Sequence, residues 1–152
     1  MEQEQLKEKI VALLPEAEFM TNKQYLDVIV PANKLHAFVT TLKETNDLKF
    51  DYLFCLSGVD WQTYFTVVYH LTSSEFGHSI VLKVKTDGRE TPEVPSLYDI
   101  YATAEFHERE AFDLFGIKFT NHPDLRRIFL EDTWVGYPLR KDYKDEINII
   151  ER

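Results

Sequence analysis

Residues 64–71, YFTVVYHL, and residues 80–85, IVLKVK, decide the fold of this 152-residue chain. In both runs every second side chain is apolar, and a period of two is typical of β-strands that bury one face. Turn-forming residues fill the gap between them, from Ser73 to Gly77. The segment therefore predicts an antiparallel β-hairpin that packs one face on the core and leaves the other face wet.

The sequence on either side of this hairpin predicts helices and further strands. The predicted helices are residues 2–14, 34–45 and 97–115, and the further strands are residues 25–30 and 52–56. We expect the 52–56 strand to be central, a turn at residues 57–60, a proline-containing loop at 91–96, and a left-handed helix end at Gly116. The order α-β-α-β-β-β-α predicts an α+β fold: a mostly antiparallel four-stranded sheet with helices packed on one face, followed by an extended C-terminal arm.

Composition excludes several classes of protein. The hydrophobic content of 44% and charged content of 28% are those of an ordinary globular domain. The sequence has one cysteine, which rules out an internal disulfide framework and an all-cysteine metal or iron–sulfur site within it. No apolar run reaches the roughly 20 residues of a membrane span, and the acidic N-terminus does not resemble a signal peptide. The net charge of −9 disfavours nucleic acid as a partner. We expect a reducing, cytoplasmic location.

The helical and strand patterns stop after Gly116. Pro123, Gly136 and Pro138 interrupt any helix, and charges are expected to break every possible strand. Ordering such a segment costs about 1–2 kcal/mol of backbone entropy per residue, so it needs extensive contacts. Residues 117–144 carry six Lys or Arg against four Asp or Glu on an otherwise acidic chain. We therefore divide the chain into a body, residues 1–115, and an extended partner-docking arm, residues 116–152.

The densest cluster of charged side chains lies before the arm, at Glu108, Arg109, Glu110 and Asp113. A solvated helix face bridged by Arg109 is the interpretation we favour. A carboxylate pair serving a small enzyme as general acid and base is a second hypothesis. A third places Arg109 beneath the arm, at the corner where the helix ends. No phosphate loop, nucleophile elbow or zinc motif is present, so we expect no catalytic residue, cofactor or metal site on this chain.

Three blocks of sequence resemble one known family. They are residues 108–117, EREAFDLFGI, residues 122–128, HPDLRRI, and residues 136–143, GYPLRKDY, with weaker similarity at Val59-Asp60-Trp61 and upstream of the helix. Their order and spacing resemble the 30 kDa subunit family of respiratory complex I, known in bacteria as the C subunit of NADH-quinone oxidoreductase. Asn121 stands where many relatives have glycine, and Tyr137 where many have histidine.

The resemblance implies a peripheral-arm subunit that binds no cofactor. NAD, quinone, flavin and iron–sulfur clusters would be used on other subunits. The chain would pack on the D subunit, which is the 49 kDa-type subunit, and lie peripherally on the cytoplasmic side of the bacterial inner membrane without spanning it. The enzyme as a whole would be a proton-translocating NADH:quinone oxidoreductase. Related subunits serve membrane-bound hydrogenase-type complexes, so an equivalent adaptor role there remains an alternative.

We expect the arm and the helix before it to form the partner interface. Arg126, Arg127, Arg140 and Lys141 would pair with carboxylates of the partner. The expected interface residues are Glu108, Arg109, Asp113, Gly116, His122, Pro123, Asp124, Leu125, Arg126, Arg127, Trp134, Gly136, Pro138, Leu139, Arg140, Lys141 and Asp142.

Overall fold

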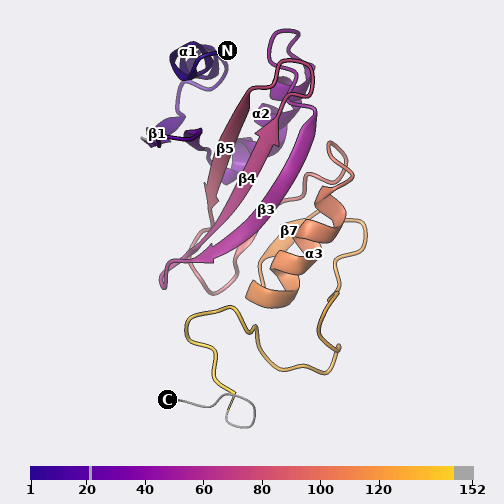
Figure 1. The fold of residues 1–152 in the computed structure, drawn as a ribbon. Helices are drawn as coiled ribbons and strands as arrows, with labels where there is room; N and C mark the ends of the chain where they lie inside the picture. The colour runs from indigo at the N-terminus through magenta and orange to yellow at the C-terminus, as the bar shows by residue number, and fades with distance from the viewer. Residues whose placement is uncertain (21, 146–152) are drawn as a thin grey trace.

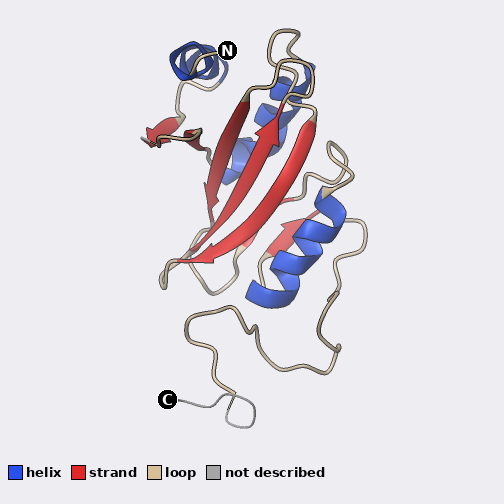
Figure 2. Ribbon diagram, in the orientation of Figure 1, coloured by secondary structure: helices blue, strands red, loops and turns tan. Residues whose placement is uncertain are grey.

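The structure is a computed structural model that describes residues 1–20 and 22–145, and it has a mixed α+β fold (Figures 1 and 2). The helices are α1 (Gln3–Leu13), α2 (Ala32–Glu44) and α3 (Ala104–Phe115). The strands are β1 (Glu18–Met20), β2 (Leu26–Ile29), β3 (Tyr52–Asp60), β4 (Phe65–Thr72), β5 (Ser79–Lys85), β6 (Glu93–Pro95) and β7 (Lys118–Thr120). Residues 146–152 of the predicted arm lie outside the described part.

The main sheet has five strands in the order β1-β2-β5-β4-β3, where four were predicted. The hairpin of β4 and β5 is confirmed. Strand β2 joins β5 in parallel, and the intervening α2 and β3–β4 hairpin supply the long crossover that a parallel pair needs. The predicted central position of β3 is wrong, since β3 is an edge strand. The predicted turn at residues 57–60 is also wrong: β3 continues through Gly58 to Asp60, paired with β4.

A second, two-stranded sheet pairs β6 with β7 in parallel. Residues 91–96 were expected to be only a loop, and no strand was expected beyond Gly116, so both expectations are wrong. The short strands escaped detection because each is three residues long, too short to show a period. Ile117 and Phe119 are buried in the same core cluster as the rest of the chain. The core therefore continues past the predicted body boundary at residue 115.

One hydrophobic core holds the helices against one face of the main sheet. The alternating side chains of β4, Phe65, Val67, Tyr69 and Leu71, are fully buried in it. Apolar residues of α2 and α3 belong to the same cluster, so both helices cover this face, as predicted. In Figure 1, α2 lies behind β4 and β5 and α3 runs beside β3.

The third helix is shorter than predicted. It begins at Ala104 rather than at residue 97, because the preceding segment forms separate turns, such as the one closed by the N–H of Tyr101 and the carbonyl of Leu97 at 2.8 Å, and its side chains bond to the body. There the Tyr101 hydroxyl donates to the carbonyl of Phe50 at 2.6 Å, and the Thr103 hydroxyl donates to that of Leu53 at 3.0 Å. The predicted end is confirmed: Gly116 caps the helix with a left-handed φ of 74°.

A close approach between β3 and α3 fixes where the helix lies on the sheet. A Cβ atom added at Gly58 would stand 2.8 Å from the ring of Phe115, closer than any normal contact. We predict that Gly58→Val lowers the free energy of unfolding by about 1–3 kcal/mol through overpacking. Urea unfolding measures the change. Ser57→Val, at the exposed neighbouring position, is the matched control, and equal stability of the two variants would contradict this packing.

Candidate functional site

The carboxylate of Asp113, on α3, organises the start of the arm. Its Oδ2 atom accepts three backbone N–H bonds, from Ile128 at 3.1 Å, Phe129 at 2.7 Å and Leu130 at 3.1 Å. Its Oδ1 atom pairs with Nη1 of Arg127 at 3.1 Å. Burial alone would raise the pKa of Asp113, but these N–H donors and the guanidinium together lower it. The charge of the fully buried carboxylate is thus compensated. The same carboxylate holds three consecutive residues of a segment that has no regular structure.

Two arginines complete this contact between α3 and the arm. Arg109 donates from Nε to the carbonyl of Arg126 at 3.1 Å and from Nη2 to that of Arg127 at 3.2 Å. Arg127 donates in turn to the carbonyl of Gly136 at 3.0 Å, which ties two parts of the arm together. We call Arg109, Asp113 and Arg127 the arm clasp.

The favoured interpretation of the charged cluster as a solvated helix face is therefore wrong. Glu108, Arg109 and Asp113 are buried, and Glu110 alone of the four is exposed. Bonds to the arm take the place of the expected helical ion pairs, because an arm backbone without secondary structure needs donors and acceptors from elsewhere. The interpretation that placed Arg109 beneath the arm is confirmed.

Glu108 bonds to the segment before the helix rather than to the arm. Its carboxylate accepts from the Ser96 hydroxyl at 2.6 Å and from the backbone N–H of Leu97 at 2.7 Å. Burial raises the pKa of Glu108 to about 7, against these two hydrogen bonds, which lower it. The buried His122 ring places its Nε2 atom 3.9 Å from the same carboxylate. The Nδ1 atom of this ring accepts the N–H of Asp124, so Nε2 carries the proton and donates to the carbonyl of Glu105.

A second ion-pair cluster fixes the arm at residues 141 and 142, and the sequence patterns did not mark Asp60 or Arg89 as members of it. Arg89 donates to both carboxylate oxygens of the buried Asp60, at 2.6 and 3.0 Å, and to Asp142 at 2.7 Å. Asp60 also accepts the backbone N–H of Lys141 at 2.8 Å. The Arg89 guanidinium holds the pKa of Asp60 well below its usual range. The signal for Asp60 was its place in the Val59-Asp60-Trp61 block, whereas Arg89 stood in no motif.

Between these two clusters the arm packs by stacking. The guanidinium of Arg140 lies 4.7 Å from the Tyr137 ring centre and 5.0 Å from that of Phe65, and its Nε donates to the carbonyl of Phe115. Arg127 stacks on the same Tyr137 ring, at 5.0 Å. These side chains leave no room beside the helix end, because a Cβ added at Gly116 would stand 2.6 Å from the Tyr137 ring.

One residue of the described arm other than glycine has a backbone conformation that favours glycine. Asn121 has a left-handed φ of 66°, in the region that glycine adopts most easily. Asparagine is among the few other residues that enter this region routinely. Asparagine at position 121 is therefore compatible with the turn.

The remaining predicted site residues divide into inward and outward groups. Leu125 packs against the core, and Trp134, Gly136 and Pro138 are half-buried. Phe129 and Val135 are exposed, with 66% and 88% of their surface free. The arm therefore turns its polar backbone toward α3 and several apolar side chains outward. The predicted site residues that face solvent are Pro123, Asp124, Arg126, Leu139, Lys141 and Asp142.

Metal-binding and membrane-spanning features are lacking in the described part of the chain. Among residues 1–20 and 22–145, no group of three or more His, Cys, Asp and Glu side chains is arranged to hold a metal ion. Over the same ranges no helix has the length and apolar character needed to cross a bilayer.

The fold and the site define an α+β domain whose buried charged residues hold a C-terminal arm in place. Residues 28–147 match the family described as "Respiratory-chain NADH dehydrogenase, 30 Kd subunit", and the chain belongs to this family. The match includes the hairpin, the clasp and the described arm, and it confirms the family predicted from the three sequence blocks.

Individual relatives agree with this assignment. The chain is 48% identical over 120 residues to the C/D subunit of the NADH-quinone oxidoreductase of Phocaeicola vulgatus, covering 78% of this chain and 23% of that one. It is 42% identical over 139 residues to the C subunit of the enzyme of the same name from Moorella thermoacetica, covering 90% and 92%. The chain thus spans about a quarter of the length of its C/D relatives and most of the length of this C relative.

A solved structure shares the fold. It belongs to the "membrane-bound sulfane sulfur reductase (MBS), an archaeal respiratory membrane complex", with a TM-score of 0.73 and 29% identity. The similarity covers 93% of this chain and 85% of that one.

The arm clasp predicts a specific response to the loss of one charge. Asp113→Asn keeps the shape of the side chain but turns one acceptor oxygen into a donor that faces N–H groups. We expect the free energy of unfolding to fall by about 1–3 kcal/mol, and trypsin to cut after Arg126 and Arg127 well before it cuts the body. Limited proteolysis followed by mass spectrometry measures the order of cleavage. Glu110→Gln, exposed on the same helix, is the control, and identical digestion of both variants would disprove the clasp.

Glu108 predicts a pH dependence of stability. Its pKa is raised in the folded chain to about 7 from an ordinary value of 4.5. The stabilisation it contributes is therefore full below pH 4.5 and is lost as the pH rises through 7. Between pH 5 and 8 the wild type should lose about 2–3 kcal/mol relative to Glu108→Gln, which cannot ionise. Urea unfolding at both pH values measures this difference, and parallel pH curves for the two proteins would refute it.

Proposed function

We propose that this chain is a structural, peripheral-arm subunit of an NADH:quinone oxidoreductase of the complex I type. The observation that carries the proposal is the family match over residues 28–147, which takes in both the body and the arm. In this role the chain supports electron transfer from NADH to quinone by holding neighbouring subunits in place. It performs no chemical step itself.

The proposed partner is the D subunit, of the 49 kDa type. Relatives named as C/D subunits carry both letters in one name, which supports a close association of the two. The outer surface of the arm supports it as the contact. Phe106 on α3 and Phe129, Val135 and Leu139 on the arm are all more than half exposed, a group of apolar side chains that a protein partner would bury.

The arm cations have two different roles in this proposal: some bond within the chain, and others are free to bind the partner. Arg127 already has an internal carboxylate at Asp113, and Arg140 bonds to a backbone carbonyl of its own chain. They shape the arm for docking. The Arg126 side chain is 68% exposed, and within the described chain its carboxylate partner is the exposed Asp124. The exposed Arg126 and Lys141 are the cations we assign to partner carboxylates.

The enzyme hypothesis built on Glu108, Arg109 and Asp113 finds no support in their geometry. Each of the three is buried, and its polar atoms are committed to Ser96, Leu97 or the arm. A catalytic group must instead face a substrate. We propose accordingly that NAD, flavin, iron–sulfur clusters and quinone are bound by other subunits, and that the chain lies peripherally on the cytoplasmic side of the membrane.

A second candidate is the equivalent adaptor role in another membrane-bound respiratory complex. The structural similarity to the archaeal sulfane sulfur reductase complex favours it. The two candidates differ in the electron donor and acceptor. An assembly purified through this chain should oxidise NADH with a quinone acceptor if the first is correct. Reaction with hydrogen or sulfane sulfur, and none with NADH, would favour the second.

The docking proposal predicts which exposed residues matter for assembly. Val135→Glu places a charge on the most exposed apolar residue of the arm without removing an internal contact, so the isolated protein should stay folded. We expect co-purification of the D-type subunit from the same organism to fall at least tenfold. Arg126→Glu should also weaken it, through charge reversal. Western blots of the tagged complex measure the retained subunit.

The matched controls for this experiment are Val11→Glu, on the outer side of α1, and Lys34→Glu, on α2. Both change exposed residues of the body, outside the arm. Full retention of the D-type subunit by Val135→Glu, or equal loss in the two controls, would overturn the proposed interface.

A further inference from the structure

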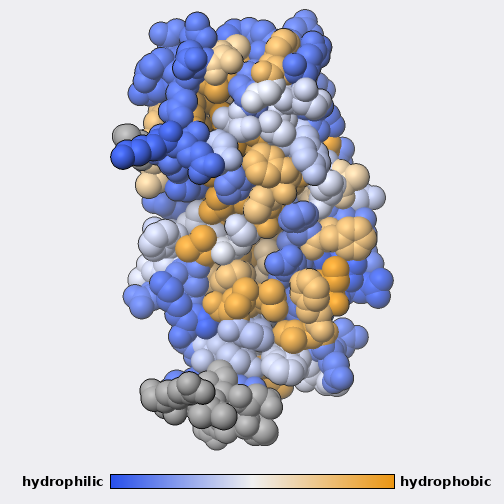
Figure 3. Space-filling model, in the orientation of Figure 1, coloured by the Kyte–Doolittle hydropathy of each residue, from blue (hydrophilic) through white to orange (hydrophobic). Residues whose placement is uncertain are grey.

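The face of the main sheet that α2 and α3 leave uncovered is unusually apolar. An antiparallel sheet with one face in water is expected to carry polar side chains there. Here Ile29, Val59 and Val68 lie on that side, and Val81, predicted to be wet, is only 3% exposed. Figure 3 shows apolar side chains gathered along the middle of the side of the molecule that presents β3, β4 and β5. A surface of this kind is suited to a contact.

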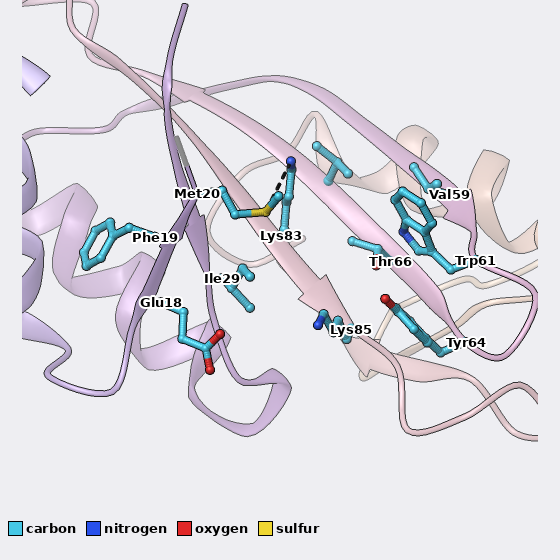
Figure 4. Close-up of a pocket in the computed structure, with 11 residues that line it drawn as sticks. Glu18, Phe19, Met20, Ile29, Val59, Trp61, Tyr64, Thr66, Lys83 and Lys85 are labelled. Atoms are coloured by element: carbon cyan, nitrogen blue, oxygen red, sulfur yellow. Dashed lines mark hydrogen bonds between the residues drawn. The ribbon is translucent and has the colours of Figure 1, made fainter. Parts of the chain in front are cut away.

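The uncovered face is also hollowed. A depression of about 540 Å³ is lined by residues of all five strands and of the β3–β4 turn. Met20 of β1 stands on one side of it, and Trp61 and Tyr64 stand on the other, with Lys83 between them (Figure 4). The Trp61 side chain is 54% exposed. The depression therefore runs between two apolar walls across the sheet.

The depression lacks the excess of negative charge that the body around it carries. Residues 1–116 carry 10 Lys or Arg against 19 Asp or Glu, but the lining has two lysines and one glutamate, Glu18. Lys83 pairs with the buried Asp27 at 2.7 Å. Lys85 instead lies over the Tyr64 ring, 5.5 Å from its centre, and pairs with no carboxylate of the described residues. An apolar occupant with a carboxylate would match this arrangement.

We propose that this depression, called here the sheet groove, binds an acidic amphipathic helix of a neighbouring protein. Apolar side chains on successive turns of the helix would lie between the Met20 and Trp61 walls, and an Asp or Glu would pair with Lys85. A helix suits the site because helices pack on sheet faces, and this one would add a third layer to a two-layer fold. The inference does not depend on the proposed function, because the sheet groove is on the face opposite the helices.

Tryptophan fluorescence tests the inference directly. The sequence has two tryptophans, so Trp134→Phe leaves Trp61 as the sole reporter. The probe is a synthetic amphipathic helix with leucines on one face and glutamates flanking them, and a second probe has lysines in place of the glutamates. We expect the acidic peptide to shift Trp61 emission to shorter wavelength and to bind at least tenfold more tightly than the basic one. Lys85→Glu should abolish this preference, and Lys118→Glu should preserve it.

Other occupants give different results. Equal binding of the two peptides, or no binding of either, would overturn the proposal. A shift caused by phosphatidylcholine vesicles but by neither peptide would identify a lipid surface instead, and a shift that grows with protein concentration alone would identify a second copy of this chain. Photo-cross-linking from position 61 in the host cell should then trap a helical segment rich in Asp or Glu. Trapping of a basic segment would contradict the proposed chemistry.

Discussion

One buried carboxylate, that of Asp113, holds the least regular part of the structure. A segment without helix or strand leaves its backbone groups unpaired, and burying it is costly unless other groups bond to it. Asp113 meets this need for three successive N–H groups, and Arg109 meets it for the two preceding carbonyls. Because the carboxylate is also paired with Arg127, its own charge is compensated. These bonds from Asp113 and Arg109 fix the course of the backbone at residues 126–130.

The rest of the arm is held in the same way, by side chains that bond to or stack on a segment without regular structure. Arg89 and Asp60, from the body, fix residues 141 and 142, and Arg140 is stacked between Phe65 and Tyr137. Arginine suits each of these positions because its planar group can bond at its edge and stack on its face. The arm thus reaches a defined shape on its own body, and the partner proposed for it would meet a preformed surface. Preformed surfaces bind with a smaller loss of conformational entropy than segments that fold on binding.

The sequence alone was informative where a pattern repeats. The hairpin of β4 and β5, the helices α1 and α2, and the left-handed cap at Gly116 all follow from period, turn residues or a single glycine. The errors have physical causes. The three-residue strands β1, β6 and β7 are too short to show a period, and Gly58 suggested a turn although it serves close packing against Phe115. Asp113 and Arg109 resembled a solvated face because the arm that buries them lies 15 or more residues away. Long-range pairs of this kind cannot be derived from local spacing. The sequence blocks that resemble the family did, however, contain both the helix residues Arg109 and Asp113 and the arm residue Arg127.

Native-state hydrogen exchange of the isolated protein tests most directly whether the body holds the arm before any partner arrives. The method reports the free energy needed to expose each backbone N–H group. We predict that the amides of Ile128, Phe129 and Leu130, which donate to Asp113, are protected to an extent comparable with those of β4. Exchange of these three amides at the rate of an unstructured peptide, while β4 stays protected, would contradict a preformed arm.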